Sequence, residues 1–456
     1  MDTKKLRQKI LDLAIRGKLV PQDPNDEPAS VLLDRIRAEK EQLIKEGKIK
    51  RSKKSAATDK SHYENVPFEI PESWCWTTLG ELCSIKGGKR LPKGKSFADT
   101  ITPHIYIRVT DMKDHTVLLS SLKYIDEDVF AEIKNYTISS NDLYLTIAGT
   151  IGDVGFVPAE LDGANLTENA AKLTDIKCSK QYLMYVLMSS IAQDHFCSRF
   201  HQVAQPKLSL ETASSTLIPL PPYREQLRIA EELDRWLGVV VSVEDDLSEL
   251  TNYVRKTKSK ILDLAISGKL VPQDPDDEPA IELLKRINPD FEPCDNSHYE
   301  NLPQGWEVCR LEDILDYEQP QAYIVNSTDY SDEYETPVLT AGKSFIIGYT
   351  NETNGICDRL PVIIFDDFTT DSKLVDFPFK VKSSAMKILR TKGEINIDYI
   401  AYYMSITRLI GNTHKRYWIS EYSKLLIPIP PYQEQLRIVE TVETIFNEIL
   451  KITAEL

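Results

Sequence analysis

"KILDLAISGKLVPQDPDDEPA", residues 260–280, repeats a stretch near the start of the chain. Residues 9–29 read "KILDLAIRGKLVPQDPNDEPA", and the two copies are identical at 19 of 21 positions. They differ only where Arg16 stands against Ser267 and Asn25 against Asp276, at an offset of 251 residues. Self-similarity of this length indicates an internal duplication. Its extent has to be known before helices and strands are assigned.

A second motif is duplicated at a different offset. "LIPLPPYREQLRI" at 217–229 returns as "LIPIPPYQEQLRI" at 426–438, with 11 of 13 identities and an offset of 209. A shorter pair, "SHYEN", starts at residues 61 and 297. The chain therefore runs as tail, variable segment, middle block, variable segment and tail.

The middle block predicts one long helix. From Tyr223 to Ser267 it contains no proline and one glycine, and its apolar residues alternate at spacings of four and three. Such a heptad pattern is typical of a helix packed in a coiled coil, here about 54 Å long at roughly 1.5 Å per residue. The predicted seam residues are Ile229, Leu233, Trp236, Val240, Val243, Leu247, Leu250, Val254, Ile261 and Leu264.

The two ends of the chain complete a second copy of this helix. Shifted by the two offsets, the residues that occupy the seam positions are Ile438, Val442, Ile445 and Ile449, and Leu6, Ile10 and Leu13. Helices that run in opposite directions between the same two segments are antiparallel. The sequence thus predicts an α+β protein: two mixed α/β domains separated by a long antiparallel coiled-coil spacer, with pseudo-two-fold symmetry. A duplicated helical hairpin with no measuring role is the alternative.

The predicted domain boundaries follow the repeats. We expect part of the spacer and a polar linker over 1–60, a first variable domain over 61–222, a central helix with a proline-rich loop over 223–296, a second variable domain over 297–430, and a C-terminal helix over 431–456. Both variable segments show short β-like runs followed by a helix, at 181–196 and 399–406. A similar order of elements with little shared sequence is expected.

Composition sets limits on partners and location. The formal net charge of −15 argues against nucleic acid as a partner. Residues 84–96, "SIKGGKRLPKGKS", nevertheless carry five basic side chains and no acidic one. The sequence starts without an apolar signal region and has no run of ~20 apolar residues, so no membrane association and a cytoplasmic location are expected.

Two divergent segments on a duplicated scaffold suggest two readers of different targets. DNA is the natural target, because two-fold protein geometry maps onto half-sites about one helical turn apart. In the first segment Lys89, Arg90, Lys93 and Lys95 are predicted to contact phosphates, and Arg108, Thr110 and Asp111 to reach base edges. In the second the candidates are Lys343, Tyr349, Lys373, Lys382 and Arg416. A solvated basic surface remains the alternative for each.

No catalytic, metal or cofactor site is predicted. Five residues separate Gly88 from Gly94, so the basic stretch lacks the spacing of a phosphate-binding P-loop. Asp366 and Asp367 fit a strand end or turn better than a metal site. His195, Cys197 and His201 lack a fourth ligand and are expected on a helix surface.

The two "LIP[LI]PPY[RQ]EQLRI" copies, the two "LDLAI.GKLVPQD" copies and "GKRLPKG…YIRVTDM" together resemble the DNA-specificity subunit of type I restriction-modification systems, over essentially the whole chain. The resemblance implies a non-catalytic protein with two target-recognition domains. Each would read one half of a bipartite asymmetric site in double-stranded DNA, and the helical spacer would set the gap. It also implies two modification (methyltransferase) subunits as partners and, through them, restriction subunits. S-adenosylmethionine and ATP are then expected on the partner subunits.

The resemblance also suggests a use for the acidic residues of the scaffold. The "QDPNDEP" and "QDPDDEP" loops, with Glu231, Glu232, Glu244, Asp245 and Asp246, are candidate docking sites, one set per modification subunit. Two other classes of function stay open. One is a non-DNA adaptor that displays two protein-binding domains, and the other is an enzyme in the second variable segment.

Overall fold

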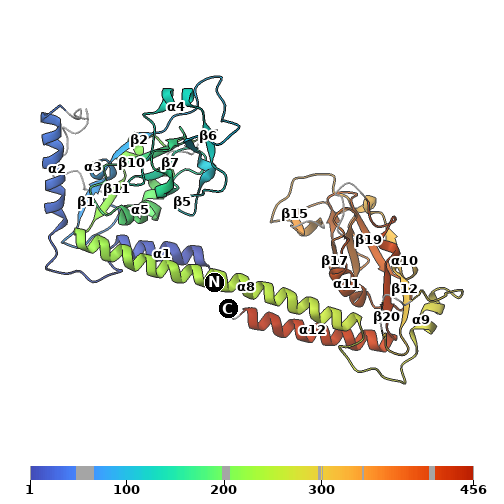
Figure 1. The fold of residues 1–456 in the computed structure, drawn as a ribbon. Helices are drawn as coiled ribbons and strands as arrows, with labels where there is room; N and C mark the ends of the chain where they lie inside the picture. Colours follow the sequence, from blue (N-terminus) through green and yellow to red (C-terminus); the bar gives the residue numbers. More distant parts are fainter. Residues whose placement is uncertain are drawn as a thin grey trace. The chain divides into compact units, whose positions relative to one another are not determined.

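The structure is a computed structural model that describes residues 2–47, 66–197, 206–295, 299, 301–340, 344–409 and 416–454. Backbone contacts divide the chain into two units, Met1–Asp246 and Leu247–Leu456, and each mixes helices with strands (Figure 1). The division falls inside one helix of 44 residues, α8 (Tyr223–Ile266), so the long central helix is confirmed. No helix in the described ranges is both long and apolar enough to span a bilayer.

Unit 1 contains seven further helices in its described residues. They are α1 (Thr3–Ile15), α2 (Ala29–Lys45), α3 (Leu79–Leu82), α4 (Glu127–Ile133), α5 (Lys180–Met188), α6 (Ser190–Cys197) and α7 (Leu210–Ser214). Its strands are β1 (Cys75–Thr78), β2 (Ser84–Gly87), β3 (His104–Ile107), β4 (Met112–Lys113), β5 (Thr116–Val117), β6 (Lys123–Ile125), β7 (Leu143–Thr146), β8 (Val154–Phe156), β9 (Asn165–Leu166), β10 (Ala170–Thr174) and β11 (Leu217–Leu220).

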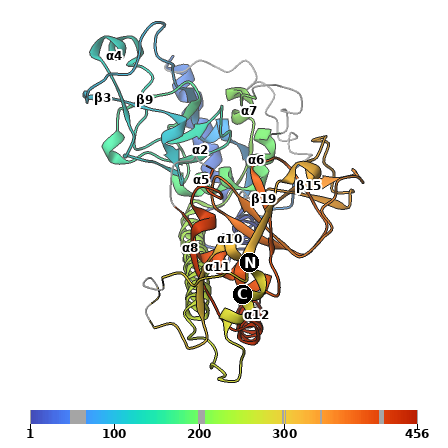
Figure 2. The same ribbon diagram turned by 90° about the vertical axis from the view of Figure 1, so that its right-hand side faces the viewer.

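The strands of unit 1 form two larger sheets. The first is antiparallel in the order β2-β10-β7-β8, and the second has the order β6-β3-β9, with β3 and β9 parallel. A separate pair, β1 with β11, joins the start of the domain to its end. In both Figure 1 and Figure 2 the second sheet and α4 lie at the end of the domain remote from α8.

Unit 2 repeats this plan. Its helices are α9 (Ala280–Ile287), α10 (Leu311–Ile314), α11 (Ile397–Ile406) and α12 (Tyr432–Ala454). Its strands are β12 (Glu307–Arg310), β13 (Leu315–Glu318), β14 (Thr336–Leu339), β15 (Ile346–Thr350), β16 (Val362–Asp366), β17 (Ser372–Val375), β18 (Lys380–Val381), β19 (Met386–Thr391) and β20 (Leu426–Ile429). The sheet orders β13-β19-β16-β17 and β15-β14-β18, with β14 and β18 parallel, match those of unit 1. The expected similarity of element order is confirmed.

Each unit pairs one terminal helix with its own part of α8 (Figure 1). In unit 1, Ile10 and Ala14 of α1 belong to the same buried cluster as Leu233 of α8. The Arg7 guanidinium lies 2.6 Å from the Glu244 carboxylate. Low residue numbers in the N-terminal stretch thus face high numbers in α8, which is the antiparallel sense.

The second unit uses the other half of α8 in the same way. Ile438 and Val442 of α12 are buried with Leu262 of α8. The ammonium group of Lys258 lies 5.0 Å from the centroid of the Phe446 ring. Two short helices thus accompany one long helix, each within its own unit.

The predicted seam is wrong at two positions. Trp236 is 40% exposed, because the next residue, Leu237, packs against the unit-1 core in its place. The Trp236 indole instead donates from Nε1 to Glu232 over 2.8 Å at the surface. Leu6 is 37% exposed, since the buried stripe of α1 runs from Ile10 to Ile15, against the domain.

The other predicted seam residues are buried or half-buried. Those below one tenth exposure are Ile229, Leu233, Val240, Ile10, Ile438 and Val442. Those of intermediate exposure are Val243, Leu247, Leu250, Val254, Ile261, Leu264, Ile445, Ile449 and Leu13. The seam is therefore tightest where α8 and α12 leave their domains and looser along the middle of α8.

The two repeated motifs meet at one joint in each unit, where the domain attaches to the helices. In unit 1 the Glu225 carboxylate accepts a hydrogen bond from Trp74 Nε1 at 3.1 Å and another from Gln22 Nε2 at 3.0 Å. In unit 2, Glu434 accepts from Trp306 Nε1 at 2.9 Å and from Gln273 Nε2 at 3.1 Å. Burial raises the pKa of both carboxyls, and the two donors counter this by favouring the charged form.

An ion pair closes each joint. Arg228 lies 2.7 Å from Asp26 in unit 1, and Arg437 lies 2.6 Å from Asp277 in unit 2. Both aspartates come from the acidic proline-flanked loops, and their side chains are nearly buried, at 2% and 8% exposure. These two carboxylates of the loops are therefore engaged inside the chain.

A glycine is required beside each joint. Gly17 and Gly268 have φ angles of +67° and +68°, in the left-handed region. A Cβ at Gly17 would lie 2.5 Å from Pro71, and one at Gly268 would lie 2.3 Å from Pro303. Both the backbone angle and the space select glycine, which explains its place in the repeated "GKLVPQD".

Replacing the joint glutamate should destabilise its unit. Glu225→Ala and Glu434→Ala each leave a buried tryptophan N–H without an acceptor, which costs about 1–3 kcal/mol. We expect the two losses to be alike in urea denaturation followed by circular dichroism. Glu231→Ala and Glu440→Ala are matched controls, because these glutamates occupy equivalent exposed positions six residues further along the same helices. Equal stability of joint and control variants would contradict the role of the joint.

Candidate nucleic-acid interface

The basic loop of unit 1 leaves the sheet at a fixed point after β2. A Cβ on Gly88 would lie 2.1 Å from the carbonyl oxygen of Thr167, so this residue must be glycine. The next amide, of Lys89, donates to the Leu166 carbonyl over 2.8 Å. The first residue of the loop is therefore held against β9.

The four predicted phosphate contacts of this loop are all exposed. Lys89 lies 5.6 Å from the Tyr136 ring centroid, and Arg90 pairs with Glu168 at 3.3 Å. Lys95 pairs with Asp128 at 2.5 Å, a hydrogen bond that raises the pKa of the lysine. Surface pairs of this kind contribute little stability, so phosphate groups can replace the carboxylates at low cost. Lys93 is also exposed, near the turn at Gly94.

The three predicted base contacts at the end of β3 differ in accessibility. The Asp111 side chain is fully buried and holds Arg108 through two bonds, Nη2 to Oδ1 at 2.6 Å and Nε to Oδ2 at 3.1 Å. Arg108 Nη2 also donates to the Ser121 carbonyl at 2.8 Å. Thr110 is exposed. Contact between Asp111 and a base would require this ion pair to open, whereas Thr110 is free to reach one.

The residues predicted for the second segment come from both larger sheets of unit 2 and from loops beside them. Tyr349 is half-buried on β15, and Lys373 is exposed on β17 with its ammonium group 4.3 Å from the Phe345 ring centroid. Lys382 follows β18, and Arg416 is exposed ahead of a turn. Lys343 lies outside the described residues. Tyr349 thus belongs to the sheet β15-β14-β18, Lys382 directly follows β18 of that sheet, and Lys373 comes from the sheet β13-β19-β16-β17.

Two lysines of unit 2 are structural. Lys380, with 2% of its side chain exposed, lies 3.1 Å from Glu352, and Lys387, with 1% exposed, lies 3.2 Å from Asp367. Because lysine is seldom fully buried, neither position could be singled out from the sequence. These ion pairs occupy the interior and leave no charge for a ligand.

The other polar residues considered were predicted to lie at a strand end or on a helix surface. Asp366 ends β16 and accepts from the backbone amides of Phe368 and Thr369, so the predicted strand end and turn are confirmed. His195 and Cys197 lie on α6, while His201 lies outside the described residues. In the described ranges no three His, Cys, Asp or Glu side chains are grouped to hold a metal ion.

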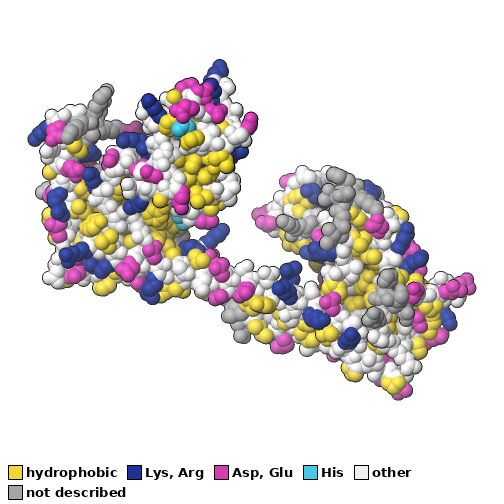
Figure 3. All heavy atoms as spheres, in the orientation of Figure 1, with side chains coloured by type: hydrophobic (Ala, Val, Ile, Leu, Met, Phe, Trp, Pro, Cys, Tyr) yellow, Lys and Arg dark blue, Asp and Glu magenta, His cyan; other side chains and the backbone are white. Residues whose placement is uncertain are grey.

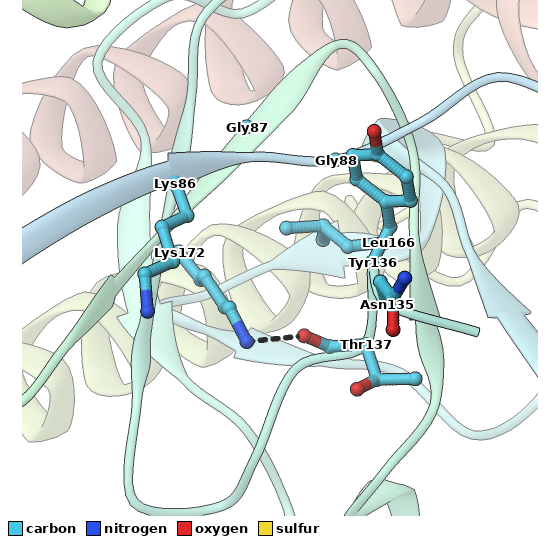
Figure 4. A pocket seen from close by; sticks show the side chains of 8 residues that line it. All are labelled: Lys86, Gly87, Gly88, Asn135, Tyr136, Thr137, Leu166 and Lys172. Atoms are coloured by element: carbon cyan, nitrogen blue, oxygen red, sulfur yellow. Dashed lines mark hydrogen bonds between the residues drawn. The ribbon is translucent and has the colours of Figure 1, made fainter. Parts of the chain in front are cut away.

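A pocket beside the basic loop was not foreseen. It has a volume of about 340 Å³ and is lined by Lys86, Lys172, Asn135, Tyr136, Thr137 and Leu166. Figure 4 shows the two lysine side chains on one wall and residues 135–137 facing them. Only the pairing of β2 with β10 brings the lysines together, and no sequence signal gives that register.

Charge on the visible face of unit 1 is mixed. Figure 3 shows acidic and basic side chains interspersed over the domain, without a broad basic patch. On this face of unit 1, basic side chains are therefore not gathered over a large area.

Comparisons with known proteins agree on one family. The model of the "Type I restriction modification DNA specificity domain" family matches residues 71–248 and 303–456. These ranges cover nearly all of both domains, together with the first part of α8 and the whole of α12.

Relatives from Escherichia coli include two specificity subunits. The specificity subunit of the type I restriction enzyme EcoR124I/EcoR124II is 46% identical over 171 residues, 35% of this chain and 42% of the relative. The EcoEI specificity subunit is 31% identical over 381 residues, 68% of this chain and 62% of the relative. The matches thus span less than two thirds of the length of either relative.

A solved structure shares the fold. It comes from work on complex assembly and conformational transition of the type I R-M system, and its TM-score is 0.55. The likeness covers 85% of this chain and 94% of that chain at 16% identity. At this level of identity the match concerns the fold alone.

Proposed function

Because the chain belongs to the family of type I restriction-modification DNA specificity subunits, we propose that it selects the DNA sequence on which such a complex acts. The domain of unit 1 reads one half of a bipartite, asymmetric site in double-stranded DNA, and the domain of unit 2 reads the other half. The antiparallel helical spacer, with pseudo-two-fold symmetry, sets the unspecified gap between the halves.

The duplicated joint is the observation that carries this proposal. Glu225 and Glu434 hold their domains to the helices through the same donors at nearly the same distances. A protein that binds two half-sites of duplex DNA with two-fold geometry requires that two domains of the same topology be attached in the same way. A single catalytic domain would have no need of it.

Divergence between the domains supports an asymmetric site. The strand orders are the same in both units, yet the first domain carries a basic loop after β2, whereas β13 of the second is followed by the uncharged residues Gln319, Pro320 and Gln321. Since sequence is read by side chains at base edges, different surfaces on the same framework select different half-sites.

The length of α8 fits the role of a spacer. Its 44 residues extend about 66 Å at roughly 1.5 Å per residue. Half-sites one helical turn apart are about 34–36 Å distant, so the helix is long enough to carry two domains between one and two turns apart.

The chain itself is a non-catalytic recognition component, as is its family. We assign methylation of adenine to two modification subunits that bind S-adenosylmethionine, and the use of ATP to restriction subunits that join through them. These partners place the complex in the cytoplasm, where DNA is available. The chain's own contribution is recognition and assembly.

Docking of two modification subunits requires the same surface twice. Leu227 and Leu436 occupy the same position in the repeated motif and are 48% and 37% exposed. Large apolar side chains that are duplicated and left on the surface are suited to protein contacts. Of the acids considered for docking, Glu231, Asp245 and Asp246 remain exposed beside the first copy, whereas Glu232 and Glu244 form ion pairs within the chain.

Mapping methylated adenines tests the proposed recognition. The chain is co-produced with its neighbouring modification subunit in a host without other adenine methylation, and the genome is read by single-molecule sequencing. We expect one new motif with two unequal specified halves and a fixed gap. An assembled complex that binds S-adenosylmethionine but leaves no new motif would favour the adaptor alternative.

Counting modification subunits by native mass spectrometry tests the docking face. Leu227→Asp and Leu436→Asp should each reduce the complex from two bound subunits to one, because each charge falls on one of the two equivalent sites. Ser248→Asp is the control, since this exposed residue lies in the part of α8 that no repeat covers. Two subunits on both leucine variants would place docking elsewhere.

A further inference from the structure

Two lysines face each other across a pair of strands beside the basic loop. Lys86 on β2 and Lys172 on β10 are direct partners in the antiparallel register, so their side chains leave the same face of the sheet. Like charges at directly opposed positions destabilise a sheet. An opposite charge beside the pair relieves this repulsion, and a bound anion can supply it.

The ammonium groups have donors to spare. Lys172 Nζ donates to the Thr137 carbonyl at 2.6 Å and lies 4.0 Å from the Asp142 carboxylate, with 19% of the side chain exposed. An ammonium group carries three N–H donors, so Lys172 keeps two beyond that hydrogen bond. Lys86 is exposed. Both charges reach the pocket shown in Figure 4.

The pocket is continuous with the predicted DNA-contacting loop. Tyr136, on the wall opposite the lysines, also lies beneath the Lys89 ammonium at 5.6 Å from its ring centroid. Gly88 lines the pocket and directly precedes Lys89. An anion in the pocket would therefore lie at the base of the loop.

The second domain supplies a natural comparison. Lys86 stands four residues after the end of α3 at Leu82, and Glu318 stands four residues after the end of α10 at Ile314. Glu318 faces Ile388 in the register of β13 with β19. The same framework thus folds with an acidic and an apolar residue at these positions, so the two lysines are not a requirement of the fold.

We propose that the pocket of Lys86 and Lys172 binds a backbone phosphate of the DNA on which the first domain sits. The inference rests on the proposed function and adds to it a phosphate site outside the basic loop, present in the first domain and absent from the second. Ammonium groups bind phosphate as point charges, and contacts to phosphate position a protein on DNA without reading its sequence.

Salt dependence of DNA binding tests this site. The full-length chain, assembled with its modification subunits, is titrated with a labelled duplex at several sodium chloride concentrations. Each lost phosphate contact lowers the slope of log affinity against log salt by about 0.9. Because both lysines hold one phosphate, we expect part of that decrease for Lys86→Ala, the whole of it, about 0.9, for the double variant with Lys172→Met, and an unchanged methylation motif.

Controls separate the site from general charge effects and from folding. Lys9→Ala removes an exposed lysine of α1 and should leave the slope as in the wild type, while Lys86→Arg should retain it. If Lys172→Met does not fold, Lys86→Ala alone tests the phosphate site, because Lys86 is exposed and its replacement should not disturb the fold.

Three results would overturn the site. Equal slopes for Lys86→Ala and Lys9→Ala, with a wild-type complex that binds DNA, would remove the phosphate assignment and leave the proposed function intact. A changed methylation motif would make the lysines readers of bases. A wild-type complex that does not bind duplex DNA would overturn the proposed function and this site with it.

Discussion

A buried carboxylate holds each domain to the helices. An ionised group taken out of water is costly unless its hydrogen bonds are replaced, so Glu225 and Glu434 are stable only with their tryptophan and glutamine donors in place. Those donors come from two other parts of the chain, the start of the domain and the loop after the paired helix. Three distant segments are thereby fixed at one point, and the sequence between them is free to diverge.

Under the proposed function, local positive charge allows an acidic chain to bind DNA. The net charge of −15 is a sum over joints, spacer and surface. Some acids are paired within the chain, as Asp26 and Asp277 are with arginine. Positive charge is concentrated after β2 and on the adjoining strands of unit 1. Under the proposed function, the first domain positions itself through a small basic region, and the partner subunits supply the remaining attraction to phosphate.

Much of this fold could be predicted from the sequence because helices and duplications leave periodic signals. The long helix follows from its heptad pattern and its antiparallel partners from the repeats, while the similar order of elements follows from the β-like and helical runs of the two variable segments. The seam failed at Trp236, since one residue of rotation moves a side chain by about 100° and only tertiary packing selects Leu237. The pocket lysines could not be found, because strand register decides which residues face each other. Burial of Asp111 was hidden for another reason: it lies in a short 3-10 turn after β3, where its carboxylate is held by Arg108.

The most direct measurement is to give both joints the same domain. Residues 74–222 would replace residues 306–431, so that the tryptophan and the paired prolines at each boundary are kept, and the methylated motif of the assembled complex would be sequenced. Two independent readers on a pseudo-two-fold spacer predict a palindromic motif, in which the first half-site appears twice in inverted orientation with the original gap. Retention of the second half-site, or no motif from a folded complex with two modification subunits, would contradict the modular reading.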